Sequence, residues 1–429
     1  MSVSCENPWL RRYACFTAFA TFVLLGIGGL VTSHNAGMAV PDWPNSNGYN
    51  MFLFPVSRWV GGILYEHTHR LVATFVGVLV VGLTRWLGGR SSRLPLALVG
   101  LVEMVAGGIL LRVGGNLKGA GYFLTGIAGV VLLAAAVWVR NESAPRPLPL
   151  LGWLAFGAVQ LQGLLGGLRV VLLKDEIGIF HATLAQLFFV LLCTIALLST
   201  GWWRRVSIFS EETVKTVELA SARSATSLKR RVNESGLGCL GLVRCFATIL
   251  TLLILGQLIL GATMRHQHAG LAIPDFPLAY DKIWPAMDAA SVELYNQKRM
   301  EATAVNPITA FQIALQMIHR LVALAIFAGV ALSAWLTARN FGFKNPLSKM
   351  TLCWLILILA QATLGAATIW SDKAADIATT HVLVGALSLA SGGLISLITW
   401  KAFGAATVSA NSIEAGRGVS TAPLAHANA

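Results

Sequence analysis

The chain places an acid and two histidines where a long apolar segment begins. Glu66, His67 and His69 stand at the start of a run that continues from Leu71 to Leu87. Ionisable side chains cost roughly 2.5–3.5 kcal/mol each at the middle of a membrane helix, so they are usually kept for function. This stretch is therefore the first candidate site for chemistry.

Four histidines recur in a duplicated pattern. The sequence His-Arg-Leu-Val-Ala begins at His69 and again at His319, and His181 is matched later in the chain by His381. Each falls in the first turns of a predicted helix running from the outside inward, so all four lie at one depth near the outer face. Two facing helices can each offer an imidazole to a metal between them. An iron porphyrin with two axial nitrogens would suit a His69/His181 pair and a His319/His381 pair.

A single histidine inside a membrane is more often explained by a hydrogen bond between helices. Four histidines in duplicated register favour a metal or haem, because hydrogen bonding alone does not require repetition at matched depth. His67 lies on a different helix face from His69 and is interpreted as an interfacial side chain.

The two copies differ one turn before the first histidine, where Glu66 is matched by Gln316. A carboxylate one turn from an axial histidine could accept a proton or position water at the porphyrin edge. The competing interpretation is an acid at headgroup level with no role. The asymmetry predicts that the first half performs chemistry and the second half holds a cofactor.

Four further residues are possible haem contacts. Arg70 and Arg320 could pair with porphyrin carboxylates, although a plain interfacial anchor is the favoured interpretation. Trp43 and Phe276 could cover a pocket or belong to the aromatic belt at the interface, and the two interpretations carry equal weight.

Composition identifies the broad class. Of the chain's residues, 55% are hydrophobic and 12% are charged, which is half the charged fraction of a typical soluble domain and indicates a polytopic membrane protein. The formal net charge of +13 is interpreted as basic cytoplasmic loops rather than nucleic-acid binding. The six cysteines show no Cys-x-x-Cys spacing, so neither a zinc site nor a disulfide framework is indicated.

Ten apolar segments are long enough to span a bilayer. They lie at about 13–33, 66–87, 94–113, 119–139, 149–171, 178–200, 246–264, 308–336, 349–370 and 379–400. The 201–245 connection carries eight Lys or Arg residues, whereas the predicted outer loop 34–65 carries only Arg58. Positive charge favours the cytoplasmic side, so both termini are predicted to be inside.

The chain contains a tandem repeat. Gly37 to Pro44 reappears as Gly270 to Pro277, and both stretches contain Pro-Asp-aromatic-Pro. Both copies begin with a helix running outward, so they are predicted to be parallel repeats related by an axis along the membrane normal. The first copy carries 51 extra residues between His69 and Gln162, which is the length of a helix pair at 94–139.

These observations predict an all-α polytopic membrane protein made of two tandem four-helix bundles related by a pseudo-twofold axis. The N-terminal bundle covers 1–200 with the extra hairpin 94–139, and the C-terminal bundle covers 246–401. A cytoplasmic linker is expected at 201–245 and a flexible tail at 402–429.

The sequence resembles the haem A synthase family. The motifs that carry the resemblance are Gly29-Leu30-Val31-Thr32-Ser33, Ala36 to Pro44, Glu66-x-x-His69-Arg70, Gln162-Gly163-x-Leu165-Gly166-Gly167, His181-x-x-x-Ala185-Gln186 and the second repeat. The resemblance implies oxidation of the C8 methyl of haem O to a formyl group, which gives haem A for cytochrome c oxidase. Glu66 would be catalytic, His69 and His181 would flank the substrate haem, and His319 and His381 would hold a haem B cofactor.

The resemblance also sets expectations about partners and location. The expected upstream partner is a haem O synthase, and the expected surroundings are the lipids of a bacterial cytoplasmic membrane. No nucleic-acid partner is expected. The electron acceptor is left unidentified, and a homo-oligomer is left open. Some members of the family use a cysteine pair in an outer loop, and this chain has none there, so it would react without that pair.

Two other functions remain open from the sequence. A membrane b-type cytochrome would only relay electrons, and shared histidine depth argues against a relay across the bilayer. A haem or porphyrin transporter would need a site reachable from both sides, whereas these histidines gather on one. The hairpin at 94–139 is predicted to be peripheral to the core, as a docking or assembly surface.

Overall fold

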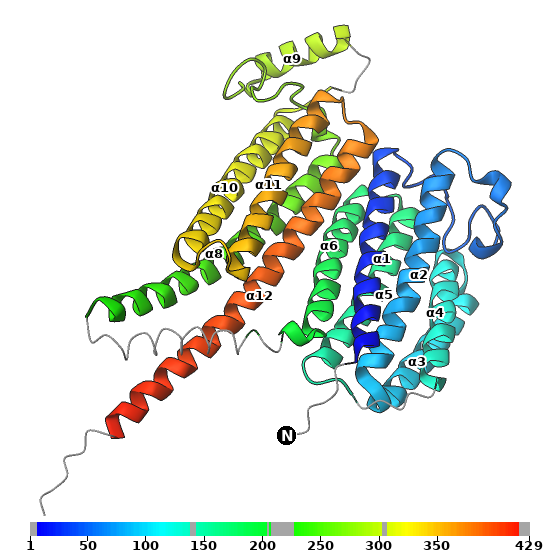
Figure 1. The fold of residues 1–429 in the computed structure, drawn as a ribbon. Helices are drawn as coiled ribbons and strands as arrows, with labels where there is room; N and C mark the ends of the chain where they lie inside the picture. The colour runs from blue at the N-terminus through cyan, green and yellow to red at the C-terminus, as the bar shows by residue number, and fades with distance from the viewer. Residues whose placement is uncertain (1–6, 138–142, 204–205, 207–226, 303–306, 420–429) are drawn as a thin grey trace, which may run out of the picture. The chain divides into compact units, whose positions relative to one another are not determined.

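The chain folds into long α-helices joined by short turns and structured outer loops (Figure 1). This computed structural model describes residues 7–137, 143–203, 206, 227–302 and 307–419. The helices are α1 Pro8–Ser33, α2 Gly62–Gly88, α3 Arg93–Val113, α4 Lys118–Ala136, α5 Leu148–Leu172, α6 Asp175–Leu198, α8 Ser227–His266, α9 Ala289–Ala302, α10 Ala310–Phe341, α11 Pro346–Trp370 and α12 Ala375–Val419.

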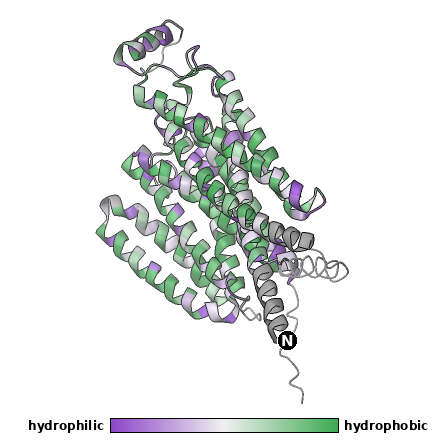
Figure 2. Ribbon diagram, turned by 90° about the vertical axis from the view of Figure 1, so that its left-hand side faces the viewer, coloured by the Kyte–Doolittle hydropathy of each residue, from purple (hydrophilic) through white to green (hydrophobic). Residues whose placement is uncertain are grey.

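Nine segments of the described chain are long and apolar enough to cross a membrane. One of them, Gly62–Val113, contains both α2 and α3, so the ten predicted spans each correspond to a long helix. Hydrophobic residues predominate along these helices, as the green ribbon shows (Figure 2). The chain is therefore an all-α polytopic membrane protein, as predicted.

Helix ends follow local sequence. The Asn7 side chain caps α1 by accepting hydrogen bonds from the N–H groups of Trp9 and Leu10. Helix α2 is bounded by Gly61 and Gly89, which both adopt φ of +55°, a left-handed conformation that favours glycine. These glycines fix the length of α2, which carries Glu66 and His69.

Helices α1, α2, α5 and α6 form a four-helix bundle. Contacts join α1 to α2, α2 to α5, α5 to α6 and α6 to α1, which closes the ring. Its core is built from small and branched side chains such as Ala14, Val76, Leu83, Ala155 and Leu192. Close packing of this kind holds the helices in fixed register.

The extra hairpin consists of α3 and α4, which pack on each other and against α2 and α5. Val81 of α2, Leu96 of α3, Val131 of α4 and Phe156 of α5 share one buried cluster. The amide of Gln160 on α5 donates a 2.6 Å hydrogen bond to the buried Glu103 carboxylate on α3. The hairpin is thus joined to the bundle by apolar packing and by a buried polar contact.

The described contacts divide the chain into two compact units. The first comprises Met1–Ser199, Leu253–Ile326 and Leu357–Ala390, and the second comprises Thr200–Leu252, Phe327–Ile356 and Ser391–Ala429. In the first unit, Leu258 of α8 packs against Gly385 of α12. In the second, Leu250 of α8 packs against Gly329 of α10, and Trp354 of α11 packs against Gly392 of α12.

Two helices continue into segments predicted to be irregular. Helix α8 begins at Ser227, inside the predicted linker 201–245, and α12 continues to Val419, inside the predicted tail 402–429. The predicted bounds of the linker and the tail follow the ends of the apolar segments, and a helix can extend beyond its apolar segment. Linker residues 204–205 and 207–226 and tail residues 420–429 lie outside the described residues. The domain boundaries and the pseudo-twofold relation stay predictions.

Candidate functional site

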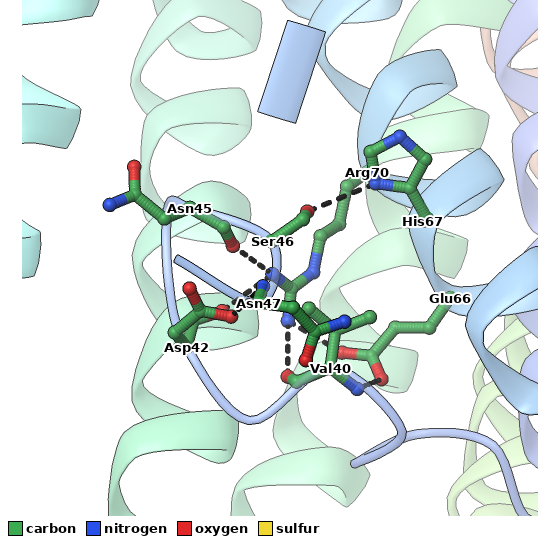
Figure 3. Close-up of polar contacts among 8 residues, drawn as sticks. All are labelled: Val40, Asp42, Asn45, Ser46, Asn47, Glu66, His67 and Arg70. Atoms are coloured by element: carbon green, nitrogen blue, oxygen red, sulfur yellow. Dashed lines mark hydrogen bonds and ion pairs between the residues drawn. The ribbon is translucent and has the colours of Figure 1, made fainter. Parts of the chain in front are cut away.

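Arg70 holds in place the loop between α1 and α2, which the sequence predicts as the first outer loop. Its guanidinium donates hydrogen bonds to the carbonyl oxygens of Asp42 at 2.6 Å, Asn45 at 2.8 Å and Val40 at 2.9 Å (Figure 3). Charge-assisted hydrogen bonds of this kind are stronger than neutral ones. Arg70 therefore anchors the loop, and its predicted contact with porphyrin carboxylates stays a prediction.

The Glu66 carboxylate is buried beneath the same loop. Its Oε1 accepts a 2.6 Å hydrogen bond from Arg70 Nη2, and its Oε2 accepts a 2.8 Å hydrogen bond from the Val40 N–H (Figure 3). Only 4% of Glu66 is exposed. An ion pair and a backbone donor both stabilise the negative charge of this carboxylate.

The second outer loop has the same frame with an amide in place of the acid. Gln316 Oε1 accepts a 2.7 Å hydrogen bond from the Ile273 N–H. Arg320 donates to the carbonyl oxygens of Leu278 at 2.8 Å and Asp275 at 2.7 Å. The loop-anchoring bond is thus shared by both copies, and the negative charge belongs to the first copy alone.

His67 is buried, which corrects its interpretation as an interfacial side chain. It is fully inaccessible to solvent, and its Nδ1 lies 3.0 Å from Ser46 Oγ. The rings of Phe54 and Trp59 lie 5.0 Å and 4.7 Å from the imidazole, measured between centroids. The outer loop folds back over α2 and encloses this side chain, which helical spacing alone does not predict.

Each of the four recurring histidines faces a glycine on a neighbouring helix. A Cβ built on Gly28 would lie 3.1 Å from His69 Cε1, and one built on Gly166 would lie 3.4 Å from His181 Cε1. In the second copy, the corresponding distances are 3.5 Å from Gly261 to His319 and 3.2 Å from Gly365 to His381. Glycine leaves room beside each ring that a larger residue would fill.

The four histidines lie near one another in two pairs. His69 and His181 are close enough to interact electrostatically, and so are His319 and His381. Each ring has a buried Nδ1 without a hydrogen-bond partner in the described structure. Buried polar atoms without partners are rare in folded proteins and point to a functional group.

These pairs fit an iron porphyrin. A porphyrin supplies its own four equatorial nitrogens, so each bundle needs to provide only two axial imidazoles. Within the described residues, no three His, Cys, Asp or Glu side chains form a group that could bind a metal ion unaided. The paired rings, the glycine clearances and the unpaired nitrogens therefore suit a ligand that brings most of its own coordination.

Trp43 packs against the extra hairpin. Its ring lies 4.8 Å from the ring of Phe123 on α4, between centroids, and it contacts Gly119 of α4 and Gly167 of α5. Phe123 in turn contacts Gly163 of α5. The hairpin therefore reaches the first outer loop as well as the flank of the bundle.

Phe276 occupies the matching place in the second loop but has different neighbours. It is 38% exposed, and its ring lies 6.0 Å from that of Trp370 on α11. The Arg320 guanidinium carbon lies 5.4 Å from the Phe276 ring centroid. The predicted contacts of Trp43, Phe276 and Arg320 with a haem stay predictions.

The glycines opposite the first histidine of each copy, Gly28 and Gly261, were not singled out in the sequence. They precede Gly37 and Gly270 by nine residues each, so an alignment of the two repeats would show that these glycines occupy equivalent positions.

The sequence also does not indicate the role of Arg265. Its guanidinium donates a 2.7 Å hydrogen bond to the Gly29 carbonyl oxygen and a second bond to Ser33 Oγ, and nothing in the repeat indicates this.

A known protein family matches more than half of this chain. The sequence model of the COX15-CtaA family, described as cytochrome oxidase assembly protein, matches residues 123–392. The chain belongs to this family. The matched range includes His181, His319 and His381 and begins after Glu66 and His69.

A curated relative is similar over much of its length. Heme A synthase of Geobacillus kaustophilus strain HTA426 is 26% identical over 260 residues, which are 60% of this chain and 67% of the relative. The haem A synthase resemblance is thereby confirmed at the level of the family. The chain is an integral membrane protein with a role in cytochrome oxidase assembly.

Proposed function

We propose that the chain is a haem A synthase that oxidises the C8 methyl group of haem O to a formyl group. The observation that carries this proposal is the duplicated histidine pair with a glycine opposite each ring. The family match and the relative named heme A synthase support the same reaction class.

In this proposal the first bundle binds the substrate. His69 and His181 are its axial residues, and Glu66 is the catalytic residue. A carboxylate offers about four acceptor sites, of which Arg70 and the Val40 N–H use two. Glu66 therefore keeps acceptor capacity for a water or a proton at the reacting methyl, while its two fixed bonds hold it in place.

In this proposal His319 of α10 and His381 of α12 would hold a haem B cofactor. When bound, this cofactor supplies one-electron transfer. Gln316 has no charge with which to accept a proton, so the second pair is suited to holding a haem rather than oxidising its periphery. The nitrogen of Gln257 donates a 2.8 Å hydrogen bond to the His319 carbonyl oxygen, and this bond helps to fix α10 beside α8.

The topology predicted from basic loops completes the proposal. Both termini lie in the cytoplasm of a bacterium, the histidine pairs lie near the outer face, and a haem O synthase supplies the substrate. Conversion of a methyl to a formyl group removes four electrons and adds one oxygen atom, so both an electron acceptor and a source of that oxygen are required.

The proposal is tested by porphyrin extraction and mass analysis of cells that make haem O, with and without this protein. The wild-type chain should produce a formyl-bearing haem. Glu66→Gln should lose that product or stop at a hydroxylated intermediate while purified protein still binds haem. Gln316→Glu is the matched control, because it adds an acid to the other copy at the same anchoring position.

Other outcomes favour the other functions. Unchanged haem O with haem-bound protein would support a b-type cytochrome or a transporter, and His381→Met would then alter only the absorption spectrum. Full formyl-haem production by Glu66→Gln would overturn the catalytic role of Glu66 and leave it as a loop anchor.

A further inference from the structure

A cavity of about 180 Å³ lies among the loop after α8, the start of α10 and the turn between α11 and α12. Its wall includes His268, Arg299, Gln312 and Lys373, and none of its described lining residues is acidic. An arginine, a lysine and a histidine around one small cavity favour the binding of an anion.

The cations are held in place by the surrounding backbone. Arg299 Nη1 donates a 2.6 Å hydrogen bond to the Leu271 carbonyl oxygen, and Arg299 Nε is buried without a partner in the described structure. Lys373 lies in the turn between α11 and α12 with φ of +64°, and its N–H donates a 2.8 Å hydrogen bond to the Thr368 carbonyl oxygen. Both side chains are partly buried at a fixed backbone position.

No Asp or Glu is among the described residues that line the cavity with Lys373, although Asp372 precedes it in the chain. Burial lowers the pKa of Lys373, and the positive charge of Arg265 lowers it further. A bound anion would relieve both effects, because it would replace lost hydration and offset the neighbouring cation. Arg70 and Arg320, by contrast, use their donors on loop carbonyls.

The cavity lies toward the N-terminal ends of α10 and α12 relative to His319 and His381. Gln312 precedes His319 by seven residues of α10, which places both on one face about 10 Å apart at 1.5 Å per residue. Lys373 precedes His381 by eight residues and lies just before α12. Arg265 is close enough for its charge to act on both Lys373 and His381.

We propose that this cavity binds the carboxylate groups of the tetrapyrrole held by His319 and His381, with Lys373 and Arg299 as the binding cations. This rests on the proposed function. Rotation about the axis through two axial histidines would otherwise be free, so the cavity selects the orientation in which the carboxylate edge of the ring points outward. The same cations could accept the phosphate of a lipid headgroup, and the test separates these sources.

The test compares haem B with its dimethyl ester, which lacks free carboxylates. Haem-depleted full-length protein with His69→Ala, which confines axial binding to the second pair, is titrated with each compound in neutral detergent and followed by visible absorbance. The His69→Ala protein, which retains Lys373, should bind haem B at least about tenfold more tightly than the ester. Hydrogen bonds to charged groups are among the stronger ones. Lys373→Gln should remove most of that preference, and Lys373→Arg should keep it.

Lys298→Gln is the matched control, since Lys298 is exposed on α9 beside Arg299 and does not line the cavity. Equal affinity for haem B and its ester in the presence of Lys373 would overturn the carboxylate site while leaving the haem proposal intact. Failure to bind either compound, in a protein whose circular dichroism remains helical, would overturn both proposals. A lipid phosphate would be the ligand instead if two results were found together. Haem B and its ester would bind equally well, and phosphatidylglycerol would compete with both in the protein with Lys373 but not in Lys373→Gln.

Discussion

Substitution of Gly365 by alanine should weaken haem binding at the second histidine pair more than it weakens the fold. The added Cβ would lie 3.2 Å from His381 Cε1, which is tighter than ordinary van der Waals contact. The imidazole must then move by a few tenths of an ångström, and an axial ligand tolerates little displacement. Small-to-large changes in a packed core typically cost about 1–3 kcal/mol.

The alanine also improves the helix. Replacement of glycine by alanine inside a helix contributes about 1 kcal/mol, so the net loss of stability for Gly365→Ala should be between zero and about 2 kcal/mol. Gly256→Ala on α8 is the matched control, because nothing lies within 4 Å of its added Cβ. That control should be as stable as wild type or more stable by up to about 1 kcal/mol.

Two measurements separate packing from ligation. Unfolding in mixed micelles, followed by circular dichroism, gives the stability of each variant, and haem titration gives its affinity. Gly365→Ala should lose about tenfold or more in haem affinity while Gly256→Ala keeps it. If the two variants bound haem equally well, the glycine opposite His381 would not be a required clearance.

Three further perturbations follow from the outer loops. Glu66→Ala should destabilise the fold by about 1–3 kcal/mol more than Glu66→Gln, because only the alanine leaves the buried Val40 N–H without an acceptor; equal unfolding free energies would contradict this. Phe123→Ala should destabilise the outer loop by removing the contact with Trp43, measured as faster hydrogen exchange at the backbone of Trp43, whereas unchanged exchange would show that the hairpin does not hold the loop. Burial raises the pKa of Tyr280 to about 12, so its contribution to stability is complete below its unfolded value near 10 and is lost as the pH rises through 12. Unfolding of Tyr280→Phe should lack this alkaline loss, and persistence of the loss in that variant would assign it to another group.

The helices and the histidine pairs could be predicted because both depend on periodic features of the sequence. Apolar runs of bilayer length locate the spans, and equal placement of His69 and His319 near helix starts fixes their depth. The duplication then indicates which histidines belong together, since His181 follows His69 in the first copy as His381 follows His319 in the second.

The contacts made by the outer loops could not be predicted in this way. Burial of His67 depends on how the chain between α1 and α2 folds back, and that fold is fixed by Arg70 bonds to backbone carbonyls that any residue could offer. The hydrogen bond from the Val40 N–H to Glu66 could not be predicted for the same reason, because its donor is a backbone group. When a charged side chain binds a backbone group, its partner cannot be recognised from residue types in the sequence.

The hairpin of α3 and α4 has a consequence for how hydrophobic molecules reach the first histidine pair. It contacts both α2 and α5, so it lies along the seam between those two helices. A ligand that diffuses in the lipid cannot enter the bundle through that seam, and Trp43 against Phe123 blocks its outer end. A lipid-borne molecule that enters this bundle from the side must therefore pass between another pair of its helices.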